Sequence, residues 1–288
     1  MIFQQRPHWR LSRLATTILI TLPSCSTAHS QNLVDSALRF FVGNDFSTVG
    51  FDLDKSRPQP VPPDFRASVL ETLPKEGRIT KLKEPQRQKL DSLGIVLRLH
   101  QRQPIYEFAI YESAPKPFAF IGLHQRAVLL ISDIALNLLT AAELQASVAH
   151  EIGHEYVWEE YLAAAARNDD RRLKELELIC DGVAILTMQR TGIDPAALVT
   201  ATEKIASFNA SSTGPSANAH RYPSDAERRR FAQAIIAGAG SPRPGSPSTG
   251  GRKWLFGNST SHIGIRSRAR HGVRRTLTYY SWEVAFSR

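Results

Sequence analysis

The strongest hydrophobic pattern lies in the middle of the chain, where Leu144, Val148 and Ile152 recur every four residues. That spacing is typical of the buried face of an α-helix. The residues T-A-A-E at positions 140–143 form a capping box, in which a hydroxyl and a carboxylate satisfy the first free amides of a helix. The sequence therefore predicts a helix over residues 141–162.

Shorter apolar runs precede this helix and are rich in residues that favour strands. They predict strands at 95–99, 105–111, 118–121 and 127–131, with residues 122–126 as a hairpin connection. Helical spacing and capping signals predict further helices at 33–41, 65–73, 85–93, 172–190, 196–208 and 226–236, with a loop at 209–218. The expected fold class is α+β, mainly helical, with a small antiparallel sheet beside the central helix.

Composition separates the two ends of the chain from its body. Residues 238–288 are rich in Gly, Ser, Pro and Arg, which predicts a basic, low-complexity and disordered tail. The excess of Lys and Arg over Asp and Glu that gives the chain a formal charge of +9 lies in this tail and in the N-terminus. The remainder is near neutral, so no nucleic acid is expected as a partner. We expect a signal peptide at 1–30, a helical and linker region at 31–94 and the main domain at 95–237.

The N-terminus has the pattern of an export signal. Three arginines within residues 6–13 precede a short apolar stretch at 14–22, and small residues follow up to a cleavage position before Gln31. A second interpretation is a bacterial lipoprotein signal with Cys25 as the lipid anchor, and a third is a retained segment. No apolar run reaches 18 residues, so no ordinary transmembrane helix is predicted. After processing a single cysteine remains, so no internal disulfide is expected.

The central helix carries the motif H-E-x-x-H at residues 150–154. Histidines at positions i and i+4 lie one turn apart on the same helix face, so His150 and His154 can bind one zinc ion. Glu151 projects beside them and is the expected general base for a water activated by the metal. Gly153 interrupts the helix, either because another element packs closely there or because the helix tolerates it.

A hydrolytic zinc site needs a third protein ligand. Glycine and histidine at positions 157 and 160 would indicate a metzincin, but Val157 and Glu160 stand there. The next predicted helix instead offers Glu177 as the ligand. Asp181, one turn later, would accept the second ring N–H of a ligating histidine. Glu175 is a rival ligand without an aspartate at i+4.

An oxyanion donor is also required, and His220 and Tyr222 are the two candidates because both are polar and directly precede the last predicted helix.

These residues resemble the gluzincin metallopeptidases of the HtpX-like and CAAX prenyl endopeptidase-like group, especially soluble, exported bacterial members. The resemblance covers residues 95–236. It implies a zincin-like metallopeptidase domain with one Zn²⁺ ion on His150, His154 and Glu177. It also implies that His220 binds the transition state and that an extended substrate pairs with a sheet edge, for which residues 127–131 are the candidate.

The chain departs from the family pattern at two positions. Cys180 stands where the family has alanine, so its thiol is either inert or a competitor for the metal. Pro117 replaces the family's asparagine, and this replacement affects how the backbone is placed at the sheet edge where the substrate would bind.

The expected function is that of a zinc metalloendopeptidase acting on polypeptides, with misfolded or membrane-associated proteins of the cell envelope as substrates. The expected location is the periplasm or the periplasmic face of a membrane. The alternative function is that of a zinc-stabilised chaperone or assembly factor with weak or lost hydrolysis.

Overall fold

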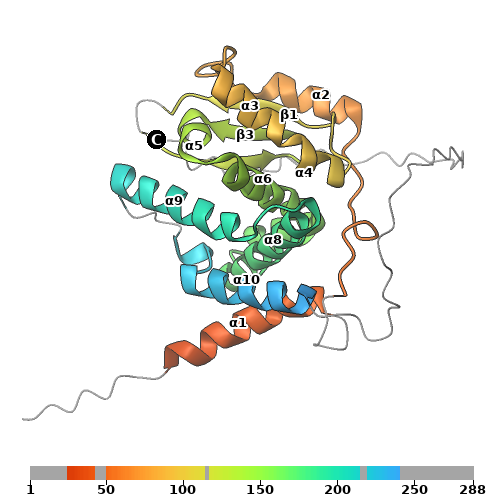
Figure 1. The fold of residues 1–288 in the computed structure, drawn as a ribbon, viewed down its shortest axis with the longest axis vertical. Coiled ribbons are helices and arrows are strands. Elements are labelled where there is room, and N and C mark those ends of the chain that lie inside the picture. The colour runs from red at the N-terminus through yellow and green to blue at the C-terminus, as the bar shows by residue number, and fades with distance from the viewer. Residues whose placement is uncertain (1–24, 43–49, 114–116, 215–218, 241–288) are drawn as a thin grey trace, which may run out of the picture.

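The structure is a computed structural model that describes residues 25–42, 50–113, 117–214 and 219–240 (Figure 1). The helices before the sheet are α1 (Cys25–Phe41), α2 (Pro63–Thr72), α3 (Glu84–Ser92) and α4 (Gly94–Leu99). After it come α5 (Asp133–Leu138), α6 (Ala141–Tyr156), α7 (Trp158–Ala166), α8 (Asp170–Thr191), α9 (Ala196–Thr213), the 3₁₀ turn η1 (Ala219–Arg221) and α10 (Asp225–Gly240). The strands are β1 (Glu107–Tyr111), β2 (Ile121–His124) and β3 (Val128–Ser132). This mainly helical α+β architecture confirms the predicted fold class.

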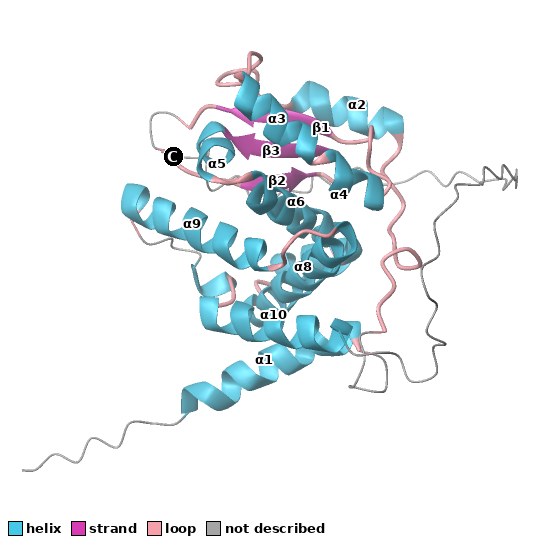
Figure 2. Cartoon of the chain, in the orientation of Figure 1, coloured by secondary structure: helices cyan, strands magenta, loops and turns pink. Residues whose placement is uncertain are grey.

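The sheet differs from the prediction in its pairing. Its order is β1-β3-β2, with β2 antiparallel and β1 parallel to β3, so the sheet is mixed (Figure 2). The segment proposed as the substrate edge is therefore wrong, because it forms the central strand. Every residue of β3 is buried, as expected for a continuous apolar run enclosed on both faces. The sheet edge next to α6 is β2.

The hairpin between β2 and β3 exists, but its turn lies later than predicted. Gln125 and Arg126 have positive φ angles of 49° and 56°, and Ala127 N donates to His124 O at 2.9 Å. Residues 122–124 belong to the strand and residues 118–120 precede it.

The strand predicted at residues 95–99 is wrong, because this run forms α4. Val96 and Leu97 are buried, and Leu97 N donates to Leu93 O in continuation of the preceding helix. A short buried apolar run has no periodicity that separates strand from helix.

The central helix α6 starts as predicted. Glu143 N donates to Thr140 Oγ1 at 3.2 Å, and Thr140 N donates to Glu143 Oε2 at 2.8 Å, which closes the capping box. The helix ends at Tyr156 rather than at residue 162, because Val157 adopts φ −125° and ψ 18° and the chain restarts as α7. The motif therefore lies in the last two turns of α6.

Helices α6 and α8 cross at close range, which explains Gly153. A Cβ atom at Gly153 would lie 2.8 Å from Cys180 Cα and 2.9 Å from Cys180 O. Helix α8 is buried over most of its length and is covered on another side by α1, whose Phe41 ring occupies the space above Gly182. Side chains from α1, α6 and α8 thus share one core.

The ends of the remaining helices also differ from the prediction. Helix α9 continues to Thr213, so the first residues of the predicted loop are helical, and α2 starts at Pro63, two residues before the predicted start. Helix α1 begins at Cys25, before the predicted cleavage position. The charged and apolar parts of the predicted signal lie outside the described residues, and so do residues 241–288 of the predicted tail. Among the helices that are described, none combines the length and the apolar character needed to cross a membrane.

Candidate metal centre and active site

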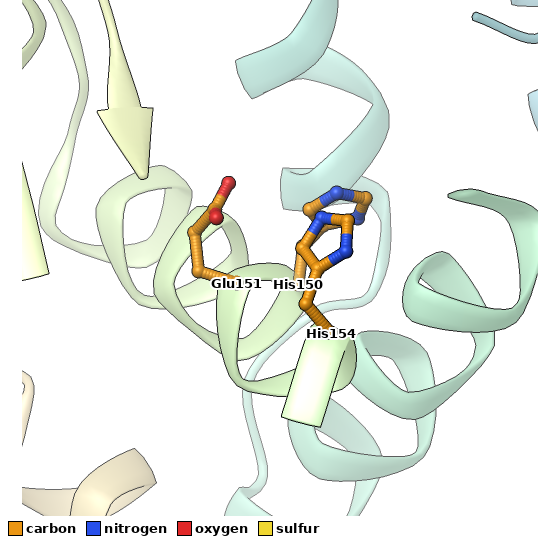
Figure 3. A group of neighbouring side chains, drawn as sticks. All are labelled: His150, Glu151 and His154. Atoms are coloured by element: carbon orange, nitrogen blue, oxygen red, sulfur yellow. The ribbon is translucent and has the colours of Figure 1, made fainter. Parts of the chain in front are cut away.

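Three side chains of α6 meet at its C-terminal end. The potential ligand atoms of His150, Glu151 and His154 all lie within 4.8 Å of one another (Figure 3). The two imidazole rings are 5.1 Å apart between centroids and nearly perpendicular. Figure 3 shows both rings on one side of the helix, with the Glu151 carboxylate projecting beside them.

Helix α8 brings Glu177 to the two histidines. His150 Nε2 lies 3.4 Å from Glu177 Oε2, and His154 Nε2 lies 3.8 Å from Glu177 Oε1. The carboxylate is 4 % exposed, and the imidazoles are 12 % and 13 % exposed. Two Nε2 atoms and a carboxylate therefore converge on one point that is almost closed to solvent.

His150 is oriented from behind by Asp181. The Nδ1 of His150 lies 2.8 Å from Asp181 Oδ1, which fixes Nδ1 as the protonated nitrogen and leaves Nε2 free to bind a metal. Arg228 of α10 donates through Nη1 to both oxygens of Asp181, at 2.5 and 2.6 Å. Its Nη2 lies 3.5 Å from Glu177 Oε2, so one guanidinium anchors both Asp181 and Glu177.

Tyr161 of α7 holds the other oxygen of Glu177. Its hydroxyl donates to Glu177 Oε1 at 3.3 Å, and its ring packs edge-on against His154 with centroids 4.9 Å apart. Because the helix breaks at Val157, α7 turns back towards α8 and Tyr161 can reach Glu177. Neither Tyr161 nor Arg228 was predicted from the sequence.

The donor set fits a divalent cation. Burial alone lowers the pKa of His150, but hydrogen bonds to Asp181 and Glu177 outweigh it and raise this pKa to about 10. Burial raises the pKa of Glu177, yet the hydrogen bond from His150 and the neighbouring positive charges bring it down to about 2. The carboxylates thus favour a positive charge at His150 Nε2, where a zinc ion can replace the proton. The residues of this site fit zinc, with two imidazoles and one carboxylate as ligands.

Glu151 has the properties of a base. Burial raises its pKa to about 7, with the negative charge of Glu177 adding to the effect. A carboxylate with this pKa can take and return a proton near neutral pH. Its Oε2 accepts a hydrogen bond from Leu123 N of β2 at 3.0 Å, which places the strand directly beside the base.

The two candidate oxyanion donors lie in different places. His220 Nε2 lies 3.3 Å from Asp170 Oδ2 at the first turn of α8, so the structure does not bring this histidine to the cluster. Tyr222 is the nearer of the two. Burial raises the pKa of its hydroxyl, and the negative charges of Glu177 and Glu151 raise it further. The residue as a whole remains 43 % exposed, so part of it is open to solvent.

Cys180 faces Gly153 within the contact between α6 and α8 and has no exposed surface. Burial raises the pKa of its thiol well above its usual range, and the charge of Glu177 adds to this effect. A neutral, enclosed thiol of this kind is a packing group rather than a metal ligand.

Comparison with known proteins identifies one segment. Residues 84–157 match Peptidase family M48. The members of this family are zinc-dependent metallopeptidases. No curated protein matches the chain.

The M48 match covers the sheet and the whole of α6, and therefore His150, Glu151 and His154. The match ends before α8, so the roles assigned to Glu177 and Asp181 rest on the distances given above and not on the family match. The match and the histidine pair together support a metallopeptidase domain with zinc as its cofactor.

Proposed function

We propose that this chain is a zinc-dependent metalloendopeptidase in which His150, His154 and Glu177 hold one zinc ion. The observation that carries the proposal is the convergence of His150 Nε2, His154 Nε2 and the Glu177 carboxylate beside a glutamate with a pKa of about 7. When bound, zinc supplies Lewis-acid activation of water and of the substrate carbonyl.

The protein's own groups supply proton transfer and orientation. Leu123 N–H holds Glu151 Oε2, so Oε1 is the atom that takes a proton from the attacking water and delivers it to the leaving amine. Asp181 keeps His150 in the tautomer that presents Nε2. The Tyr222 hydroxyl donates to the carbonyl oxygen as negative charge develops on it.

An extended substrate would lie along β2. Leu123 N–H points away from β3 towards Glu151, so the outward edge of this strand passes beside the base. Main-chain hydrogen bonds to such an edge align a peptide without demanding a particular side chain. This arrangement suits a polypeptide substrate, the class that the match to Peptidase family M48 implies.

A narrower setting is also proposed. The N-terminal sequence pattern supports export, with Cys25 as an optional lipid anchor, and therefore a periplasmic enzyme acting on misfolded or membrane-associated envelope proteins. The resemblance of the sequence to soluble, exported bacterial members of the HtpX-like group would fit the same setting. The alternative of a non-hydrolytic, zinc-stabilised chaperone is not favoured, because Glu151 has the position and pKa of a base.

The test combines metal content with cleavage of casein by the purified full-length protein. We expect about one zinc per chain and cleavage that stops with a chelator and returns with zinc. Glu151→Gln should retain the zinc and lose the cleavage, whereas Glu177→Gln should lose both. Equal cleavage by wild type and Glu151→Gln would contradict the proposal.

A further inference from the structure

The outward edge formed by β2 and the residues just before it, from Ala119 to Leu123, is open over only part of its length. Phe120 faces β3, because Ser132 N donates to Phe120 O at 3.0 Å. Main-chain groups alternate in direction along a strand, so Ala119, Ile121 and Leu123 all face outward. The hydrogen bond from Leu123 N to Glu151 agrees with this alternation. An incoming peptide could therefore meet three outward positions.

One of these positions is already taken by a side chain of α9. Asn209 Oδ1 accepts from Ala119 N at 2.7 Å, and Asn209 Nδ2 donates to Ala119 O at 2.9 Å. A side-chain amide that accepts from an N–H and donates to a C=O of the same residue makes the two bonds that a neighbouring strand would make. Asn209 thus stands in for a paired residue at Ala119.

The space between the two occupied positions remains accessible. Ile121 and Gly122 are partly exposed, and a Cβ atom at Gly122 would meet nothing within 4 Å. Within the described part of the chain, Ile121 is the outward-facing residue of this edge whose N–H and C=O have no protein partner.

We infer that Asn209 determines how far a substrate can pair, by ending the binding edge at Ala119 and leaving one main-chain pair, at Ile121, on that flank of the scissile bond. This inference rests on the proposed peptidase function. The substrate class it implies is an extended segment recognised through one residue on this flank, such as a loop or a chain end. Longer strands gain nothing by extending further, because Asn209 occupies the next pairing position.

The experiment is an ester scan of a peptide that the full-length, zinc-loaded protein cleaves. Each amide N–H on either side of the scissile bond is replaced in turn by an ester oxygen, which removes one donor without changing the side chains. In the wild type we expect one position on the flank that runs towards Ala119 to lower kcat/KM about fivefold, the size of one lost hydrogen bond. Positions further along that flank should change kcat/KM less than twofold.

Asn209→Ala should release Ala119 and make a second position sensitive, two residues further along the same flank. Ser211→Ala is the matched control, since Ser211 lies in the same helix and its hydroxyl bonds only to Phe208 O among the contacts described. It should reproduce the wild-type scan.

The outcomes separate the two proposals. Two alternating sensitive positions on the flank towards Ala119 in the wild type, or an unchanged scan in Asn209→Ala, would overturn the role of Asn209 and leave the peptidase function standing. Absence of any chelator-sensitive cleavage would overturn the proposed function and this inference together.

Discussion

Tyr222 and His220 lie two residues apart but face different carboxylates. The charges of Glu177 and Glu151 raise the pKa of the Tyr222 hydroxyl, whereas His220 contacts Asp170. If Tyr222 donates to the developing oxyanion, Tyr222→Phe should lower kcat about 100-fold with little change in KM, because the bond forms only in the transition state. Steady-state kinetics on one peptide measures both constants.

His220→Ala provides the matched comparison for that variant. We expect its kcat to stay within about twofold of the wild type, because its partner Asp170 lies two turns of α8 before Glu177. A large loss in His220→Ala together with a small loss in Tyr222→Phe would reverse the assignment.

Tyr161 acts on the metal through Glu177. Tyr161→Phe keeps the ring against His154 and removes only the hydroxyl that donates to Glu177 Oε1. We expect zinc affinity to fall about tenfold, the lower range for loss of a group that orients a ligand. Competition with a chromophoric chelator measures the affinity without any substrate.

The control for Tyr161→Phe is Tyr111→Phe, whose hydroxyl donates to Pro74 O away from the site. Its zinc affinity should match that of the wild type. Equal affinities for all three proteins would show that the Tyr161 hydroxyl does not position Glu177.

At the scale of elements, the crossing of α6 and α8 depends on Gly153. Gly153→Ala places a methyl group within 3 Å of main-chain atoms of Cys180, which cannot rotate away. We expect the free energy of unfolding to fall by about 1–3 kcal/mol and zinc affinity to fall with it, because the ligands lie on both helices. Urea unfolding and chelator competition measure the two effects.

Two further variants test the cause. Gly122→Ala should cost less, since a methyl group there meets nothing within 4 Å. Cys180→Ala should not rescue Gly153→Ala, because the clash is with Cα and O rather than with sulfur. Rescue by Cys180→Ala would mean that side-chain volume, not the backbone approach, sets the helix spacing.

Elements with their own local signals could be predicted from the sequence. The capping box of α6 marks a helix start by short-range chemistry and occurs where predicted. Helix α8 ends at Thr191, one residue after the predicted end, and Gly192 caps it with a φ of 72°. The predictions that failed depended on where a segment lies in the tertiary structure. The run at 95–99 is helical because it continues α3, and β3 is central because strands from both sides pair with it.

The same division applies to the site. The i, i+4 spacings of His150 with His154 and of Glu177 with Asp181 are helical geometry and can be read locally. Arg228 lies in a run of three arginines that resembles a solvated helix face, and only the docking of α10 on α8 brings it to Asp181.

At the scale of the whole molecule, a buried histidine outside the metal centre links stability to pH. His100 joins α4 to α6 and α8 through Tyr156 OH at 3.0 Å and Thr187 Oγ1 at 2.8 Å. Burial lowers its pKa to about 3, and the charge of Arg102 adds to the lowering. The unfolded chain takes up a proton at this residue below about pH 6.5, and the folded chain does not.

The contribution of His100 to stability is therefore fully present above about pH 6.5. It is lost as the pH falls towards 3, at up to about 1.4 kcal/mol for each pH unit. Urea unfolding at pH 7.5 and pH 5 should show a steeper decline for the wild type than for His100→Gln, which keeps the polar contacts without titrating. Parallel declines would contradict this account.

The contact between Cys180 and Gly153 also allows the opening of the α6–α8 interface to be measured from the rate of thiol labelling. Cys180 is fully enclosed where α6 meets α8, and the chain has only two cysteines, so Cys25→Ser leaves a single thiol. A thiol reagent can reach this sulfur only when the two helices separate, so the labelling rate reports how often they do. A metal held from both helices should slow the labelling in proportion to its occupancy, so one labelling curve would serve as a binding titration.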